Sequence, residues 1–445
     1  MDDTFSISSP KIDPSRRPAR EMRPDGSPDD NDRIEIGPTA LAFEEWAERG
    51  LDAPNLEAMR QYRLDRLCAE LRKRDYGGIV MFDPLNIRYA TDSSNMQLWI
   101  THNPARACFV SADGYVILWD FFNCGHLSSY LPLIRETREG GADFFYFDQG
   151  DKVDEVAKGF AGQIDIEMRK HAGANRRVAV DRMEIAGVRA FDAIGLEIMS
   201  GQVVTEHARS IKGPECIKAM RCAIATCEIA MAEMERRMQP GMTEVELWAV
   251  LHSENIKRGG EWIETRIMSS GPRTNPWFQE CGPRIIQDGD LVGFDTDLIG
   301  PYGMCADLSR TWFCGEGQPS DEQKHVFNFA HEHIMTNAEL LAPGVGFTEV
   351  VQKSHRLTDE FRDQRYGVMM HGVGLCDEWP AIRYPEDFME GAYEYDLQPG
   401  MCICVEIYAG AVGSKHGVKL ENQVLITENG HECLSPYPFD PKLLG

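Results

Sequence analysis

The spacing of hydrophobic and polar residues changes along the chain, and these changes predict two folded regions after a polar start. Residues 1–38 contain six prolines, many charged residues and few aliphatic side chains, which indicates a flexible arm. From about residue 39 to 75, apolar residues recur at three- and four-residue spacings, as in an amphipathic helix. An apolar run over 77–82 then predicts a buried strand.

Strand-like and helical patterns continue to alternate up to about residue 205. Residues 107–110, 115–119 and 178–180 are short apolar runs typical of buried strands, while 153–168 has helical spacing. Alternating strands and helices are typical of a layered α/β fold. We therefore expect residues 39–205 to form an α/β domain.

A second region begins after a connector that ends near residue 215. Its first helix should run to about Met238, because Pro240 and Gly241 follow. Thr243 with Glu246 is a capping-box signature for the next helix. Ser320 with Gln323 is a second signature of the same kind. With strand-like segments on both sides of these helices, residues 206–445 are expected to form an α+β domain.

The composition narrows the classes of function. The chain has 445 residues, with 46 basic and 71 acidic side chains and a net charge of −25. This balance argues against nucleic acid or an anionic membrane as a partner, but suits a metal or a cationic ligand. No apolar run is long enough to span a membrane. Thirteen cysteines without a Cys-x-x-Cys pair, and no signal-peptide pattern, predict a reduced cytoplasmic protein.

Candidate chemistry is confined to the second region. Asp295 and Asp297 end an apolar run, and their spacing of two would place both carboxylates on one face of a strand. A Gly-Pro turn follows at residues 300–303, and Asp307 comes directly after it. A hairpin there would place Asp297 opposite Asp307.

Three further polar residues stand among strand-forming apolar neighbours: His371, Glu406 and Glu421. Taken singly, each has an ordinary structural explanation, as a core histidine or a strand-edge charge. Together with the aspartates they form an oxygen-rich set with one imidazole, and a buried carboxylate needs a compensating cation. This set predicts a dinuclear site for iron, manganese, cobalt or zinc rather than a calcium or magnesium cage.

These residues, in this order, resemble the pita-bread metallopeptidases of the aminopeptidase P, prolidase and creatinase superfamily. The resemblance covers about residues 55–430 and implies a creatinase-like N-terminal domain, a pita-bread catalytic domain and a two-metal site. Asp295 is an additional candidate ligand, because this chain has Asp-x-Asp where the family usually has Asp-x-Gly. The ligands that the resemblance implies are Asp297, Asp307, His371, Glu406 and Glu421.

Two departures from the peptidases predict a different reaction. In the peptidases a second histidine follows the metal-binding histidine by six residues, whereas this chain has Asp377 there. An upstream histidine is also missing, and Trp277 stands in the corresponding loop. Those two histidines orient the scissile carbonyl and move protons during amide hydrolysis, so their loss disfavours a peptidase.

An aspartate beside a metal-bound substrate can abstract a proton from carbon, and an aromatic face can hold an onium group. The chain is accordingly similar to the dimethylsulfoniopropionate lyase branch of the superfamily. That resemblance implies β-elimination of a small zwitterionic sulfonium substrate to dimethyl sulfide and acrylate, with iron as the metal and a homodimer as the assembly. Asp377 would be the general base. The candidate sulfonium-binding aromatics are Tyr366, Trp277 and Trp379.

Two alternatives stay open at this point. An Xaa-Pro metallopeptidase would keep the metal site but lacks its histidines here. A non-catalytic peptidase-like scaffold would be expected to lose the metal carboxylates, which this chain retains.

Three other histidines, His325, His331 and His333, have spacings of six and eight rather than the four of a chelating pair, and they are expected on a helix surface.

Overall fold

The computed structural model describes residues 36–392 and 394–445 and divides into two compact units. The first unit contains Leu56–Arg209, and the second contains Gly37–Asn55 together with Ser210–Gly445. Almost the whole of the arm predicted over residues 1–38 lies outside the described residues. Among the described helices, none has both the length and the apolar character needed to cross a membrane.

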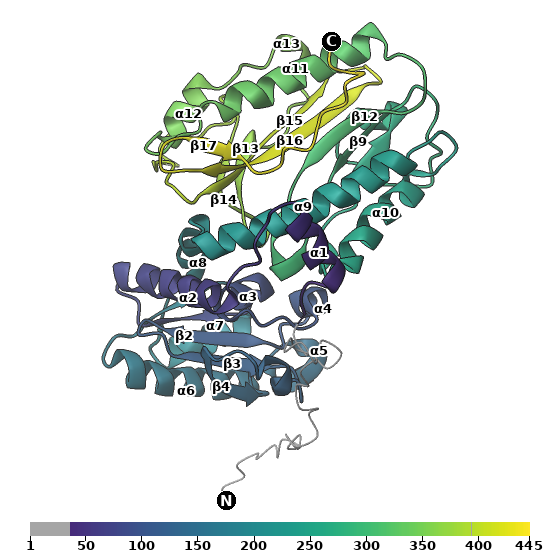
Figure 1. Cartoon of the computed structure of the whole chain (residues 1–445). Helices are drawn as coiled ribbons and strands as arrows, with labels where there is room; N and C mark the ends of the chain where they lie inside the picture. The colour runs from purple at the N-terminus through teal and green to yellow at the C-terminus, as the bar shows by residue number, and fades with distance from the viewer. Residues whose placement is uncertain (1–35, 393) are drawn as a thin grey trace, which may run out of the picture. The chain divides into compact units, whose positions relative to one another are not determined.

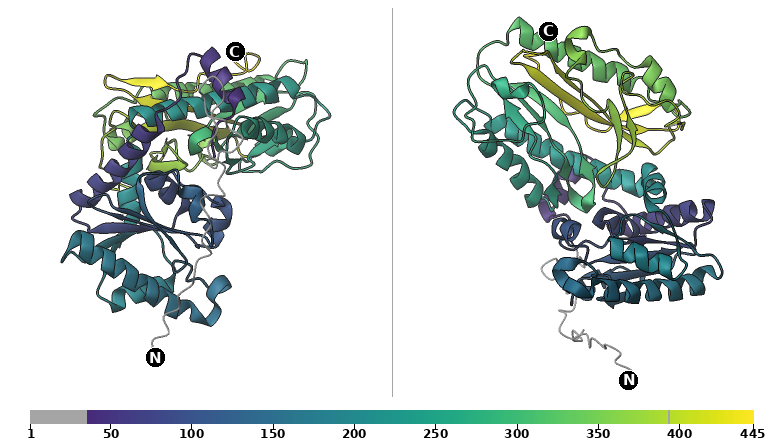
Figure 2. Two further views of the ribbon diagram at one scale, coloured as in Figure 1. Left: turned by 60° about the horizontal axis from the view of Figure 1, so that its bottom comes forward. Right: turned by 180° about the vertical axis from the view of Figure 1, so that it is seen from behind.

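The first unit is a six-stranded mixed sheet with helices on both faces (Figures 1 and 2). The strand order is β4-β3-β2-β1-β5-β6, in which β1, β5 and β6 are parallel and β2 is antiparallel to its neighbours. The strands are β1 (Gly78–Met81), β2 (Ala107–Ser111), β3 (Val116–Asp120), β4 (Ile134–Glu139), β5 (Arg177–Val180) and β6 (Glu197–Ser200). Because the central strand is covered on both faces, its sequence is a continuous apolar run.

Helices separate most of the strands of this unit, as the sequence predicts for an α/β domain, but β2, β3 and β4 follow one another without an α-helix between them. Their bounds are α2 (Leu56–Lys73), α3 (Pro84–Thr91), α4 (Gln97–His102), α5 (Tyr146–Gln149), α6 (Val153–Ala172), α7 (Ile185–Ala193) and α8 (Gly201–Ser210). Helices α6 and α7 contribute Phe160, Ile164 and Phe191 to a core that also contains Phe109 and Trp119 of the sheet. This core holds the unit together by burying aromatic and aliphatic surface between the two layers.

The second unit contains two strand-and-helix halves. In the first half, long helices α9 (Pro214–Arg237) and α10 (Glu244–Lys257) accompany the strands β7 (Trp262–Ile263), β8 (Met268–Ser270), β9 (Leu291–Asp295), β10 (Leu298–Ile299), β11 (Cys305–Ala306) and β12 (Ser309–Phe313). These strands form two three-stranded sheets, β11-β10-β7 and β12-β9-β8.

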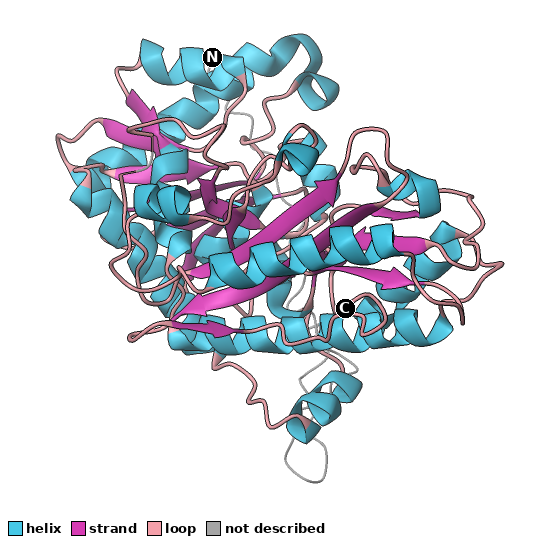
Figure 3. Ribbon diagram, turned by 90° about the horizontal axis from the view of Figure 1, so that it is seen from above, coloured by secondary structure: helices cyan, strands magenta, loops and turns pink. Residues whose placement is uncertain are grey.

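In the second half, a five-stranded sheet in the order β14-β13-β15-β16-β17 lies under helix α11, which runs along β15 and β16 (Figure 3). The strands are β13 (Met370–Val373), β14 (Asp377–Ile382), β15 (Cys402–Gly410), β16 (Gly417–Ile426) and β17 (His431–Cys433). The helices are α11 (Asp321–Ala338), α12 (Phe347–Lys353) and α13 (Asp359–Arg362).

Both predicted capping boxes are confirmed. The Thr243 side chain accepts a hydrogen bond from the Glu246 N–H, and the Glu246 side chain accepts one from the Thr243 N–H. Ser320 and Gln323 make the same reciprocal pair at the start of α11. Local side-chain chemistry therefore sets where these helices begin.

The helix predicted over 39–75 is two helices, and its first part joins the second unit rather than the N-terminal domain. Helix α1 (Ala40–Glu48) ends before Gly50 and Pro54, and α2 begins at Leu56. The Trp46 ring packs 5.8 Å from the ring of Tyr302, and Arg258 binds Glu45 through two contacts of 2.5 and 2.7 Å. Apolar spacing predicts a helix but not which core its apolar face contacts, so the predicted boundary at residue 39 was wrong.

The surface position expected for His333 was also wrong. His333 is fully buried on α11, where Asn337 donates to its Nε2 at 2.9 Å and the Nδ1 atom of His355 lies 3.2 Å from its own Nδ1. Burial, together with the neighbouring His355, lowers the pKa of His333 to about 3. The imidazole is therefore neutral in the folded protein at neutral pH.

Replacing His333 with glutamine should make the stability of the protein less sensitive to acid. A lowered pKa means that the contribution of His333 is complete above pH 6.5 and is lost as the pH falls towards 3. At pH 5 the unfolded state is favoured by about 2 kcal/mol relative to neutral pH through this one group. Urea unfolding of wild type and His333→Gln at pH 7 and pH 5 measures the difference. Equal pH dependence in the two proteins would contradict a buried neutral imidazole.

Candidate metal centre

An irregular hairpin places Asp297 and Asp307 at facing positions. Strands β9 and β12 pair so that Asp295 lies opposite Ser309, and β10 pairs with β11 beyond them. The Thr296 hydroxyl bridges the two chains, since it donates to the Ala306 carbonyl at 2.8 Å and accepts from the Leu308 N–H at 2.9 Å. The hairpin is as the sequence predicts.

The strand expected to carry both Asp295 and Asp297 is interrupted between them. Strand β9 ends at Asp295, and Asp297 has a φ of 36°, in the left-handed region. The Thr265 hydroxyl donates to the Asp297 carboxylate at 2.6 Å and fixes its direction. The two carboxylates still reach the same site, but through a backbone bend rather than through strand alternation.

The two glutamates are direct cross-strand neighbours in the five-stranded sheet. Glu406 of β15 pairs with Glu421 of β16, and both side chains are almost completely buried. His371 of β13 pairs with Cys404 of β15, which places the imidazole beside the glutamates. Like charges directly opposite each other destabilise a sheet, so this arrangement requires cations.

The imidazole of His371 points at three carboxylates. Its Nε2 atom lies 3.5 Å from Asp307 Oδ2, 3.4 Å from Glu406 Oε1 and 3.3 Å from Glu421 Oε1. Two donors bound to one ion at about 2.1 Å, with angles of 90–110° between the bonds, are about 3.0–3.4 Å apart. The spacing around Nε2 is therefore close to that of ligands which share a metal.

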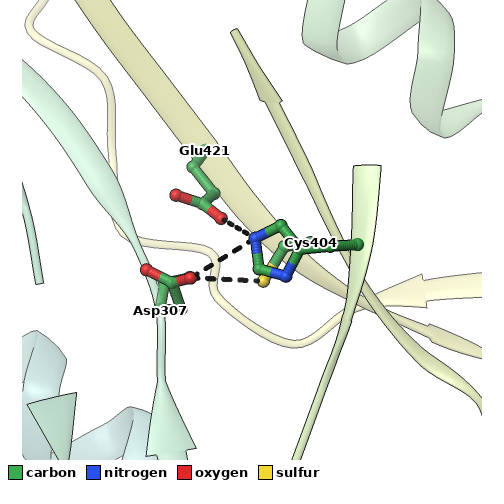
Figure 4. Close-up of side chains that lie close together, drawn as sticks. Asp307, Cys404 and Glu421 are labelled. Atoms are coloured by element: carbon green, nitrogen blue, oxygen red, sulfur yellow. Dashed lines mark hydrogen bonds and ion pairs between the residues drawn. The ribbon is translucent and has the colours of Figure 1, made fainter. Parts of the chain in front are cut away.

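The potential ligands form three overlapping groups whose donor atoms lie within 4.8 Å of one another. Asp307, Cys404 and Glu421 point toward one another in Figure 4. The groups share Asp295, Asp307 and Glu421, as carboxylates do when they bridge two ions. The groups are Asp307, His371, Cys404 and Glu421; Asp295, Glu406 and Glu421; and Asp295, Asp297 and Asp307.

Buried oxygen atoms in this cluster lack hydrogen-bond donors. One oxygen each of Asp307, Glu406 and Glu421 is buried and accepts no hydrogen bond. Burial and the neighbouring carboxylates raise the pKa of Asp297 to about 8 and the pKa of Asp307 well above its usual range. Burial also raises the pKa of Glu406 to about 8, although Lys419 opposes the shift. The cluster thus fits a cation that would keep these groups ionised.

Lys419 already supplies one cation. Its ammonium group lies 3.0 Å from Asp295 Oδ2, 2.8 Å from Glu406 Oε2 and 2.9 Å from Glu421 Oε2, and the side chain is fully buried. Burial alone would raise the pKa of Glu421, but Lys419 and His371 outweigh burial and lower it. Lys419 therefore contacts all three members of one group of potential ligands, Asp295, Glu406 and Glu421. The other two groups are left for metal ions.

Asp377 is placed differently from the other carboxylates. It begins β14, its side chain is 56% exposed, and its Oδ1 lies 3.6 Å from His371 Nδ1. The partly dehydrated surroundings raise the pKa of Asp377, the His371 imidazole opposes this shift, and the Glu421 and Asp295 carboxylates add to it. The arrangement therefore provides an accessible base beside a buried metal-binding cluster.

The three candidate aromatics are not equivalent. The Tyr366 ring borders the cluster, with the Lys419 ammonium 5.1 Å from its centroid, and stacks on Phe278. Trp277 is buried and stacks on Tyr408, while the Trp379 ring packs against Phe347 and Tyr395. The contacts of Tyr366 reach the cluster directly, whereas the ring contacts of the two tryptophans are with other aromatic side chains.

Comparisons with known proteins identify the family. Residues 218–428 match the model of metallopeptidase family M24. The chain is 56% identical, over 98% of both sequences, to the dimethylsulfoniopropionate lyase DddP of Roseovarius nubinhibens, and 54% identical over the same shares to that of Roseobacter denitrificans. The chain belongs to the DddP family.

The fold of this DddP family member is shared with peptidases of low sequence identity. The Xaa-Pro dipeptidase of Bacillus anthracis superposes with a TM-score of 0.67 at 20% identity, covering 86% of this chain and 99% of that one. The prolidase of Pyrococcus horikoshii gives 0.66 at 19% identity. These similarities confirm the pita-bread fold, and the match of residues 218–428 to the metallopeptidase model supports a divalent metal.

Sequence reasoning missed two members of the cluster, Lys419 and Cys404. In a strand, residues two apart share a face, so Lys419 lies on the face of Glu421 and Cys404 on the face of Glu406. The alternation Lys-Leu-Glu within an apolar strand was therefore a usable signal for a buried cation.

Removal of metal from this DddP family member should lower its thermal stability. Without metal, the five buried carboxylates repel one another, and Lys419 and the His371 imidazole contact only four of them. A ligand present at 100-fold above its Kd stabilises by about 2.7 kcal/mol, which for a unit of this size is about 5–10 °C in Tm. Calorimetry before and after chelation, with metal analysis of both samples, measures the change. The variant Asp307→Asn should respond less, and an unchanged Tm after complete metal removal would contradict the site.

Proposed function

We propose that the protein cleaves dimethylsulfoniopropionate to dimethyl sulfide and acrylate by β-elimination. The observation that carries this proposal is the position of Asp377, an accessible carboxylate 3.6 Å from His371 at the edge of the buried cluster. The near full-length similarity to two proteins named as lyases of this substrate supports it.

Charge balance supports a two-metal centre. Five carboxylates form the buried cluster, and the Lys419 ammonium neutralises one of them. Two divalent ions would neutralise the other four, with His371 as a neutral ligand. Asp377 then lies outside this balance. The ligands we propose are Asp295, Asp297, Asp307, His371, Glu406 and Glu421.

The bound metal would draw electron density from the substrate carboxylate and so make the adjacent C–H bond more acidic. Asp377 takes that proton, and its raised pKa makes it a stronger base than an ordinary carboxylate. The electrons of the C–H bond form the carbon–carbon double bond of acrylate. The C–S bond breaks, its electron pair stays on sulfur, and dimethyl sulfide leaves as a neutral molecule.

Tyr366 is the aromatic that we assign to the sulfonium, because its ring borders the cluster and already lies near a cation. Trp277 and Trp379 remain weaker candidates for the same role.

Iron is the metal that we propose, with manganese, zinc or cobalt as alternatives, since an oxygen-rich site with one imidazole suits all four. We further propose a homodimer located in the cytoplasm.

Headspace detection of dimethyl sulfide tests this function. Purified metal-loaded wild type should release dimethyl sulfide from dimethylsulfoniopropionate. The substitution Asp377→Asn keeps the shape but removes the base, so kcat should fall about 10²–10⁴-fold with unchanged metal content.

The matched control is Asp359→Asn, which alters an exposed aspartate on α13 and should leave kcat unchanged. An Asp377→Asn protein with full activity would overturn the assignment of the base. A wild type that releases no dimethyl sulfide but hydrolyses Xaa-Pro dipeptides would overturn the lyase in favour of a peptidase.

A further inference from the structure

A second buried ion pair lies under the turn that carries Asp377. The Lys212 ammonium is 2.9 Å from Glu378 Oε2, and the two side chains are only 4% and 1% exposed. Neither residue belongs to the metal cluster, and the elimination reaction does not use either of them. Both belong to the second unit.

Each end of this pair is fixed to the backbone. The Lys212 N–H donates to the Gly400 carbonyl at 2.8 Å, and Ile211 forms a bridge with Met401, just before β15. At the other end, Glu378 Oε1 accepts a hydrogen bond from the Leu375 N–H at 3.0 Å. One carboxylate oxygen is therefore held by Lys212 and the other by the turn.

The turn is shaped around the Glu378 carboxylate. A Cβ atom at Gly374 would lie 2.4 and 2.5 Å from the two oxygens of Glu378, so a larger residue would displace the carboxylate. The Gly374 N–H also donates to the Cys376 carbonyl at 3.0 Å, which closes the turn. Glu378 thus occupies the inside of the loop between β13 and β14.

This turn sets the distance between His371 and Asp377. Strands β13 and β14 pair Gly372 with Glu378 and Val373 with Asp377, and a bulge separates His371 from Gly372. The Asp377 side chain is 56% exposed, and its backbone position relative to His371 is set by the turn and by the register of the two strands. Misplacing a catalytic group by about 1 Å can reduce a rate by about 100-fold.

We propose that Glu378, held by Lys212, is a positioning residue that keeps Asp377 beside His371. An apolar pair of similar size would fill the same space, and buried ion pairs are often replaceable in this way without loss of stability. The pair is therefore better explained by the backbone geometry it imposes than by its contribution to folding. Its kinetic consequence rests on the proposed lyase function.

Two double variants separate positioning from folding. In Lys212→Met/Glu378→Leu the charges are removed and the Leu375 N–H loses its acceptor. In Lys212→Met/Glu378→Gln the charges are also removed, but an amide oxygen can still accept from Leu375. We measure kcat and KM for dimethyl sulfide release, metal content, Tm, and hydrogen exchange of the peptide that covers residues 373–377.

The leucine variant should retain metal and a wild-type KM within about 2-fold, while kcat falls about 10–100-fold and the turn exchanges faster. The glutamine variant should have a kcat and a rate of hydrogen exchange in the turn between those of the leucine variant and wild type. If the leucine variant does not fold, the glutamine variant alone provides the test. A wild-type kcat or wild-type turn exchange in the variants would overturn the proposal. The control Arg258→Met breaks different ion pairs, with Glu254 and Glu45, and should lower Tm without changing kcat or turn exchange.

Failure of this inference can be distinguished from failure of the lyase function. If wild type releases no dimethyl sulfide, the proposed function is wrong, while turn exchange still decides whether the pair fixes the turn. If wild type is active and the variants lose activity together with their metal, the pair supports the metal cluster instead, and the positioning role is wrong.

Discussion

The direct pairing of Glu406 with Glu421 across two buried strands is the constraint on which the catalytic unit depends. Two carboxylates at opposed positions in a sheet interior repel each other and have lost their hydration. The Lys419 ammonium contacts both of them, and the His371 imidazole faces the oxygens that Lys419 does not contact. The hairpin that brings Asp297 and Asp307 together adds further negative charge to the same place, so the fold concentrates charge that only cations can balance.

The acidic side chains of this centre differ in role because they differ in burial, not because they differ in residue type. The carboxylates of the cluster are buried and have lost most of their hydration, which suits them to bind cations. Asp377 lies at the accessible edge, where it can exchange a proton with solvent. The turn between β13 and β14 separates these two environments by a few residues, which explains how neighbouring aspartates and glutamates can have different roles.

Much of this arrangement could be predicted from the sequence, because ligand order and spacing are local. The capping boxes at Thr243 and Ser320 and the hairpin that pairs Asp297 with Asp307 follow from short patterns, and the pita-bread fold follows from the resemblance to the metallopeptidase superfamily. Contacts between distant segments could not be predicted in this way. The packing of α1 within the second unit, the burial of His333 and the contacts of Lys419 depend on which surfaces meet in three dimensions, and sequence periodicity does not specify that.

The most direct test of a centre with one ammonium and two metal ions is anomalous X-ray diffraction from crystals of the metal-loaded protein, measured on both sides of the metal absorption edge. The charge balance predicts two anomalous peaks in each chain. One should lie among Asp307, His371, Glu406 and Glu421, and the other among Asp295, Asp297 and Asp307, with the Lys419 ammonium between carboxylates that bind no third ion. A single peak, or a peak at the position of the Lys419 ammonium, would contradict the account.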